Sequence, residues 1–165
     1  MTAARQPWKA QQARYCVAIA AGLLLFAAVS PASGEQPALV VNNRTGLAIS
    51  GFDPVAYFTD KTPQAGRPEL ELNSGGAVWR FRNEGNRAEF AAHADIYTPQ
   101  FGGYDPVAIA NGKSVPGHPL FWTVTADRLY LFYSDEARAA FLADPGRIID
   151  RATRKWPDVS RTVPR

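Results

Sequence analysis

One segment of this chain occurs twice, and this repetition constrains the fold more than any other feature of the sequence. GFDPVAYF begins at Gly51 and GYDPVAIA begins at Gly103, while VWRFRNEGNRAEFAAH and LYLFYSDEARAAFLAD correspond farther along. Ordered matches at a nearly constant offset are typical of an internal repeat. We therefore interpret residues 51–97 and 103–145 as two copies of one unit. The alternative is that strand-turn-helix units look alike because they obey the same capping and packing rules.

Each copy begins with the signal for a short helix. Asp53 and Asp105 each stand directly before a proline. This order is typical of an N-cap followed by proline at the first helical position. We expect a short helix after each aspartate, and the second should end at Asn111-Gly112, since glycine commonly follows a helix.

An antiparallel β-hairpin is predicted next in each copy. Alternating apolar residues indicate strands at 70–72 and 77–82 in the first copy. The second copy shows the same pattern at 121–125 and 128–133. Short segments of turn-forming residues separate the strands of each pair, as in a hairpin.

Three further helices are marked by polar residues that can cap them. Asn83 and Ser134 are candidate N-caps after the two hairpins, and Asp144 repeats the pattern of a cap before proline. The last of these helices should cover 145–156. Its apolar residues recur at helical spacing, which predicts one face packed on the domain and a basic face in solvent. The apolar face is Ile148, Ile149, Ala152 and Trp156, and the basic face is Arg147, Arg151 and Arg154.

Together these elements predict an α+β fold, in which two pseudo-repeated helix/β-hairpin/helix units pack as one small domain with a C-terminal amphipathic helix. The domain should cover residues 40–157. Residues 158–165 are expected to form a frayed tail, as is common at chain ends.

The first 32 residues have the layout of a signal peptide. Arg5, Lys9 and Arg14 make the start positive, an apolar stretch follows at 16–29, and small residues precede a cut after Ala32. The apolar stretch is shorter than the roughly 20 residues that a membrane-spanning helix needs. We therefore expect export to the periplasm or secretion, a short linker at 33–39 and no stable membrane anchor after cleavage. A retained anchor is the alternative.

Cleavage changes both the charge and the chemistry of the chain. It removes three basic residues and no acidic ones from a total of 18 and 15, so the mature chain is formally neutral. Binding to nucleic acid is therefore not expected. Cleavage also removes Cys16 and Met1, the only sulfur-containing residues. The mature chain can form no disulfide and offers no ligand for Cu(I) or an iron-sulfur cluster.

Several motifs follow one another in the order found in YHS domains. These are DPVA at Asp53, WRF at Trp79, NRAEF at Asn86, Ile96-Tyr97, PQFGGY at Pro99 and RKWP at Arg154. The chain resembles the bacterial exported YHS domain-containing proteins, a group that includes selenoproteins, over residues 40–157. In this resemblance it is a member without cysteine.

The resemblance implies metal binding, because many YHS domains carry cysteines at fixed places in these motifs. Here Ala56 and Ala108 follow the two Asp-Pro-Val elements, and Asn83 and Ser134 stand near the second cysteine position. Asp105 stands where the exported group often has cysteine or selenocysteine. The cofactor is therefore unknown, and a metal would have to be a hard or borderline divalent ion held by oxygen and nitrogen.

The repeat suggests which residues could form a site. If the two short helices meet at their N-termini, one cleft could be lined by Asp53, Tyr57, Phe101, Tyr104 and Asp105. The candidate metal ligands are Asp53, Asp105 and His93. The simpler interpretation of the aspartates is that they cap helices, and that of the aromatic residues is that they belong to the core.

No recognisable catalytic motif accompanies these residues, so we expect a non-catalytic binding module. Its partner would be a small ligand, a metal or a periplasmic protein. The alternative is a metal-dependent or carboxylate-pair enzyme that uses Asp53 and Asp105.

Overall fold

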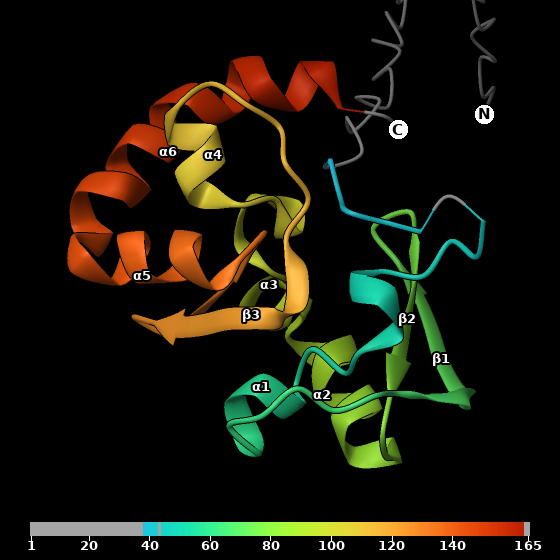
Figure 1. Cartoon of the computed structure of the whole chain (residues 1–165). Coiled ribbons are helices and arrows are strands. Elements are labelled where there is room, and N and C mark those ends of the chain that lie inside the picture. The colour runs from blue at the N-terminus through green and yellow to red at the C-terminus, as the bar shows by residue number, and fades with distance from the viewer. Residues whose placement is uncertain (1–37, 43, 164–165) are drawn as a thin grey trace, which may run out of the picture. The chain divides into compact units, whose positions relative to one another are not determined.

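The computed structural model describes residues 38–42 and 44–163 (Figure 1). The expected signal peptide, and the linker up to residue 37, lie outside the described residues. Gly34–Arg165 forms one compact unit. Its helices and its two antiparallel two-stranded sheets make a small α+β domain, which confirms the predicted fold class. Within the described ranges, no helix combines the length and the apolar character needed to span a membrane.

The elements fall into two successive series. The first series is η1 (Ile49–Gly51), α1 (Ala56–Thr59), β1 (Arg67–Ser74), β2 (Ala77–Phe81), α2 (Glu84–Ala92) and α3 (Ala94–Tyr97). The second series is η2 (Gln100–Gly103), α4 (Pro106–Ala110), β3 (His118–Thr125), β4 (Arg128–Phe132), α5 (Asp135–Ala143), α6 (Pro145–Val159) and η3 (Ser160–Thr162). In Figure 1 the green hairpin β1–β2 lies beside α2, and the orange strand β3 lies beside α5.

The two series agree closely in their hairpins and in the helices that follow. Strand β1 starts at residue 67 and β3 at residue 118, and the same offset relates β2 to β4 and α2 to α5. Each hairpin has an irregularity at the equivalent place, between Arg67 and Glu71 or between His118 and Trp122. This agreement is what an internal repeat would produce. A common origin by duplication stays a prediction.

The local signals in the sequence correspond to observed caps. The Asn83 side chain accepts a hydrogen bond from the Asn86 N–H at 2.8 Å, and Ser134 accepts one from the Ala137 N–H at 3.3 Å. Asp144 caps α6 in the same way, through the Arg147 N–H. These bonds satisfy backbone donors that the first turn of a helix leaves without partners, so each helix begins where the sequence predicts.

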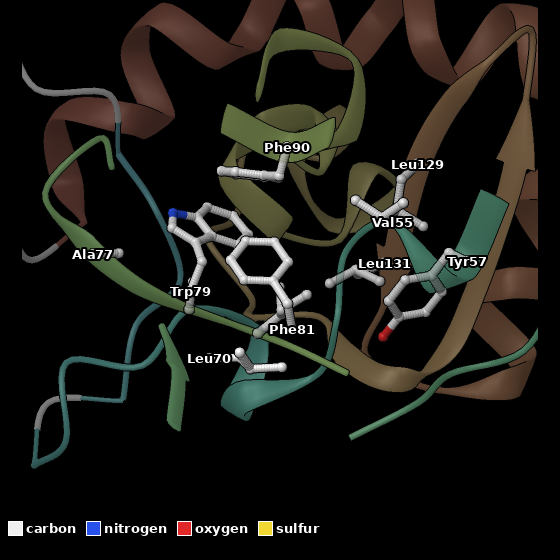
Figure 2. Packing of buried hydrophobic residues seen from close by; sticks show 11 residues of the cluster. Val55, Tyr57, Leu70, Ala77, Trp79, Phe81, Phe90, Leu129 and Leu131 are labelled. Atoms are coloured by element: carbon white, nitrogen blue, oxygen red, sulfur yellow. The ribbon is translucent and has the colours of Figure 1, made fainter. Parts of the chain in front are cut away.

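The strand β4 is buried on both faces and joins two parts of the core. Leu129 and Leu131 lie in a cluster with Trp79 and Phe90, as Figure 2 shows. On the other face of the strand, Tyr130 and its neighbour Phe132 contact Phe141 of α5. Successive side chains of a strand point to opposite faces, so β4 contributes to both clusters at once.

The helix α6 packs as predicted on its apolar face, but its polar face differs from the prediction. Ala152 is fully buried, and Ile148 and Trp156 pack against the same cluster. Arg147 and Arg154 are exposed. Arg151 is half-buried, because its guanidinium donates hydrogen bonds to the last carbonyl of α4 and to the side chain that follows it.

The end of the described chain is packed, in contrast to the predicted frayed tail. Helix α6 continues past Trp156 to Val159, and η3 follows. Val159 and Val163 are 5% and 7% exposed and belong to the cluster that contains Tyr104 and Ile109. Burial of these two valines fixes the segment. The mostly polar sequence around them did not predict this packing.

Candidate functional site

Asp53 is fully buried, and both of its carboxylate oxygens accept hydrogen bonds. Its Oδ1 accepts from the Val55 N–H at 2.9 Å and from the Ala56 N–H at 3.4 Å. Its Oδ2 accepts from the Arg82 N–H at 2.9 Å and from the Asn86 Nδ2 at 2.7 Å. The carboxylate therefore holds the turn that leads into α1, whose N-cap residue is Val55 rather than the predicted Asp53, and it also fixes the chain where β2 leads into α2.

Asp105 repeats this arrangement in the second half of the domain. It is 2% exposed. Its Oδ1 accepts from the N–H groups of Val107 and Ala108, at 2.7 and 3.3 Å. Its Oδ2 accepts from the Tyr133 N–H at 3.0 Å, where β4 leads into α5. Each aspartate thus has its partners within its own half.

These contacts determine what the two aspartates can do chemically. A carboxylate that acts as a base or as a metal ligand must direct an oxygen toward the substrate or ion. Here each of the four oxygens already faces at least one N–H donor, and neither side chain reaches solvent. The structure therefore agrees with the interpretation of Asp105 as a helix cap, gives Asp53 a structural role in the turn before α1, and shows no geometry for a carboxylate pair.

Tyr57 lies close to Asp53 and is fully buried. Its hydroxyl donates a hydrogen bond to the Pro119 carbonyl at 2.9 Å, and its ring meets the edge of Trp122 with 5.2 Å between centroids. Burial raises the pKa of Tyr57 well above its ordinary value, and the negative charge of Asp53 adds to this effect. Tyr57 is therefore a neutral link between α1 and β3.

Tyr104 lies with Phe101 near the end of α6. The ring of Tyr104 packs on Trp156, with 5.9 Å between centroids, and Phe101 packs on the same ring at 5.8 Å. Burial raises the pKa of Tyr104. Tyr104 is thus a core residue, whereas Phe101 is only half-buried and also borders a cavity.

The candidate metal ligands do not form a cluster. His93 is exposed at the junction of α2 and α3, while Asp53 and Asp105 are buried in their own halves. Across residues 38–42 and 44–163, no group of three or more His, Cys, Asp or Glu residues could hold a metal ion.

A pocket of about 340 Å³ opens beside the β1–β2 turn. Three separate segments form it: the start of the described chain, the turn with the strand after it, and the segment from α3 to η2. Its lining residues are Ala38, Leu39, Ser74, Gly75, Trp79, Ala94, Asp95, Thr98, Pro99, Gln100, Phe101 and Gly102. Neither Asp53 nor Asp105 lines it.

The walls of this pocket are mainly apolar, and apart from Ser74 its polar side chains come from one short segment. The half-buried Phe101 supplies aromatic surface, while Trp79 is almost fully covered and its Nε1 donates to the Ser74 carbonyl at 3.0 Å. That bond fixes the indole in place. The polar side chains of Asp95, Thr98 and Gln100 have no hydrogen-bond partner within the described part of the chain. Apolar walls with a few available polar groups are typical of ligand sites.

Glycine at position 102 is what allows the pocket to form. Phe101 and Gly102 both have positive φ, at 53° and 62°. A Cβ atom on Gly102 would collide with the Ala38 carbonyl. The first described segment runs across this glycine and is held there, since the Val40 N–H donates to the Gly102 carbonyl at 2.8 Å.

Of the residues predicted for a ligand site, only Phe101 lines this pocket. Sequence reasoning missed Trp79, because its alternation in a strand indicates a core position, and Trp79 is indeed only 2% exposed. Asp95 and Thr98 belong to no motif, and Gln100 lies in the PQFGGY motif but was not predicted as a site residue. The Phe-Gly-Gly-Tyr sequence was the available signal for this part of the molecule.

The chain matches no protein-family model, no curated protein and no solved structure. The resemblance to exported YHS domains therefore depends on the sequence motifs, and function has to be inferred from the chain's own chemistry.

Proposed function

We propose that this chain is an exported, YHS-like binding module that holds a small organic ligand in the pocket lined by Trp79 and Phe101. The mainly apolar lining of that pocket, at a volume of about 340 Å³, is the observation that carries the proposal. It lies within the range of roughly 300–1,000 Å³ that is usual for ligand pockets. Export to the periplasm or outside the cell follows from the signal peptide proposed for residues 1–32.

A non-catalytic role is supported by the state of the acidic residues. The two buried aspartates are occupied by backbone donors, and an enzyme that used them would have to break those bonds. Hydrogen bonds to charged groups contribute about 1.5–3 kcal/mol each, so such a rearrangement would be costly. The pocket, by contrast, offers polar groups that are already available.

A fragment screen tests the proposal. The compact unit Gly34–Arg165 is labelled with ¹⁵N, and the Trp79 indole N–H, assigned with Trp79→Phe, reports binding by NMR. We expect fragments with one or two rings to shift this signal with dissociation constants below about 1 mM, which corresponds to roughly 4 kcal/mol.

A pair of variants shows where the fragments bind. Thr98→Trp should fill the pocket and weaken binding at least about tenfold, a difference of about 1.4 kcal/mol. Thr153→Trp, on the exposed face of α6, is the matched control and should bind normally. If no fragment binds, or if the pocket variant and the control bind equally well while both melt as the wild type does, the proposed function is wrong. Should Thr98→Trp fail to fold, the same comparison is made with Phe101→Ala.

A further inference from the structure

The polar side of the pocket carries a negative charge. Among the residues that the structure describes, Asp95 is the only ionisable side chain that lines it. Asp95 is exposed in the first turn of α3, and no ion pair occupies its carboxylate among the residues that the structure describes. A ligand that enters the pocket therefore meets a negative charge at its rim.

One cation, Arg128, contacts the backbone of Asp95 but not its side chain. The Arg128 guanidinium donates to the backbone carbonyl of Asp95 at 3.0 Å and does not line the pocket. This bond anchors α3 to β4. It leaves the carboxylate of Asp95 as the charged group that faces a ligand, with Thr98 and Gln100 as neutral neighbours.

The other side of the pocket suits a flat apolar body. Phe101 and Leu39, which are both half-buried, provide apolar surface. Aromatic faces also attract cations, by about 0.5–2 kcal/mol depending on how far the cation is desolvated. The two sides of the pocket thus favour the same kind of ligand.

We infer that the pocket selects a small organic cation, in which an ammonium group is joined to an apolar body of about one ring. The ammonium lies at Asp95, with Thr98 and Gln100 as further hydrogen-bond partners, and the ring lies against Phe101 and Leu39. This inference rests on the proposed function, since it specifies the ligand class for the same pocket.

Three probes of similar size test the sign of the charge. These are 2-phenylethylamine, 2-phenylethanol and 3-phenylpropionate, titrated into the compact unit Gly34–Arg165 at pH 7 with the Trp79 indole signal as the readout. We expect the amine to bind about tenfold more tightly than the alcohol, with the carboxylate weakest. Raising the salt from 0.05 to 0.5 M should weaken the amine alone, because salt screens exposed charges.

Two variants identify the residue responsible. Asp95→Asn should remove most of the preference for the amine over the alcohol, whereas Gln100→Glu adds a second carboxylate and should increase it several-fold. Asp135→Asn, another exposed aspartate in the first turn of a helix but outside the pocket, is the matched control and should change nothing.

The outcomes separate this inference from the proposed function. Equal or tighter binding of 3-phenylpropionate would assign the recognition to Arg128 and overturn the inference. A preference for the amine that persists in Asp95→Asn would also overturn the inference. Binding of other fragments while all three probes fail to bind would overturn it too. In each of these cases the pocket still binds ligands. Only the failure of every fragment would overturn the proposed function as well.

Discussion

At the scale of single residues, the two buried aspartates combine functions that are usually separate. One oxygen of Asp105 caps α4 and the other fixes the junction between β4 and α5, while the two oxygens of Asp53 hold the turn before α1 and the junction between β2 and α2. Asparagine caps a helix nearly as well as aspartate. It offers only one oxygen, however, so its amide group would face the donors that now bind Oδ2.

This geometry makes asparagine a disruptive substitution at both positions. Asp53→Asn opposes its amide group to the backbone N–H of Arg82, and Asp105→Asn opposes it to the backbone N–H of Tyr133. An unsatisfied buried donor costs about 1–3 kcal/mol. We expect both variants to lower the free energy of unfolding in urea at pH 7. Equal stability of both variants and the wild type would contradict this account.

Tyr57 predicts how stability depends on alkaline pH. Its pKa is raised in the folded state, so above pH 10 the unfolded chain binds fewer protons than the folded chain. The contribution of Tyr57 to the free energy of unfolding should therefore be fully present below about pH 10. Above that pH it should fall, by up to about 1.4 kcal/mol per pH unit. Tyr57→Phe should reduce that slope. At pH 7 the same variant should lower the free energy of unfolding by about 1 kcal/mol, because it lacks the hydrogen bond to the Pro119 carbonyl.

Urea unfolding between pH 8 and 11 measures this slope. Tyr133→Phe is the control, since Tyr133 is 65% exposed and should leave the slope unchanged. A slope as steep in Tyr57→Phe as in the wild type would show that other groups control alkaline unfolding.

At the scale of elements, a glycine precedes the first strand of each hairpin. A close approach to neighbouring backbone, rather than a positive φ, requires glycine there. Glycine 117 precedes β3, and a Cβ atom there would lie 2.6 Å from the Gly103 carbonyl oxygen and 2.6 Å from the Leu131 Cβ. Gly66 stands in the equivalent place before β1, against the backbone of Arg80. In both halves the chain crosses over a strand at a distance that only glycine permits.

A pair of alanine substitutions tests this closeness. Gly117→Ala should destabilise the domain by more than about 2 kcal/mol, because strand backbone has to shift. Gly146→Ala in α6 has nothing within 4 Å of the added carbon and should stabilise the domain by about 0.5–1 kcal/mol. The two midpoints of urea unfolding should move in opposite directions. A Gly117→Ala variant as stable as the wild type would contradict the contact.

The elements also show what the sequence could predict. Both hairpins, both helices after them and the cap of α6 follow from signals a few residues apart, such as Asn83 and Ser134. The pocket could not be predicted in this way, because Leu39, Trp79 and Gln100 come from distant segments. The packed end at Val163 was missed for the same reason, since its partners lie far away along the chain.

At the scale of the whole domain, the two halves share one core. Leu129 and Leu131 from the second half pack in the cluster of Trp79 and Phe90 from the first. The bond from Tyr57 to the Pro119 carbonyl crosses between the halves too. Each half is therefore missing part of its core when it stands alone, although both have the same order of elements.

This sharing predicts that neither half folds by itself. Two fragments, residues 34–98 and 99–165, divide the chain between α3 and η2. We expect each alone to lack a cooperative thermal transition, because a chain of that size buries too little surface when its core is incomplete. Mixing the two should restore the helical circular dichroism signal and the shifted indole resonance of Trp79. The control is a mixture in which the second fragment carries Leu131→Ala, which removes a side chain from the first half's core at a cost of about 2–5 kcal/mol. The two fragments in that mixture should associate more weakly. If the first fragment folds cooperatively on its own, the halves are independent units and the prediction is wrong.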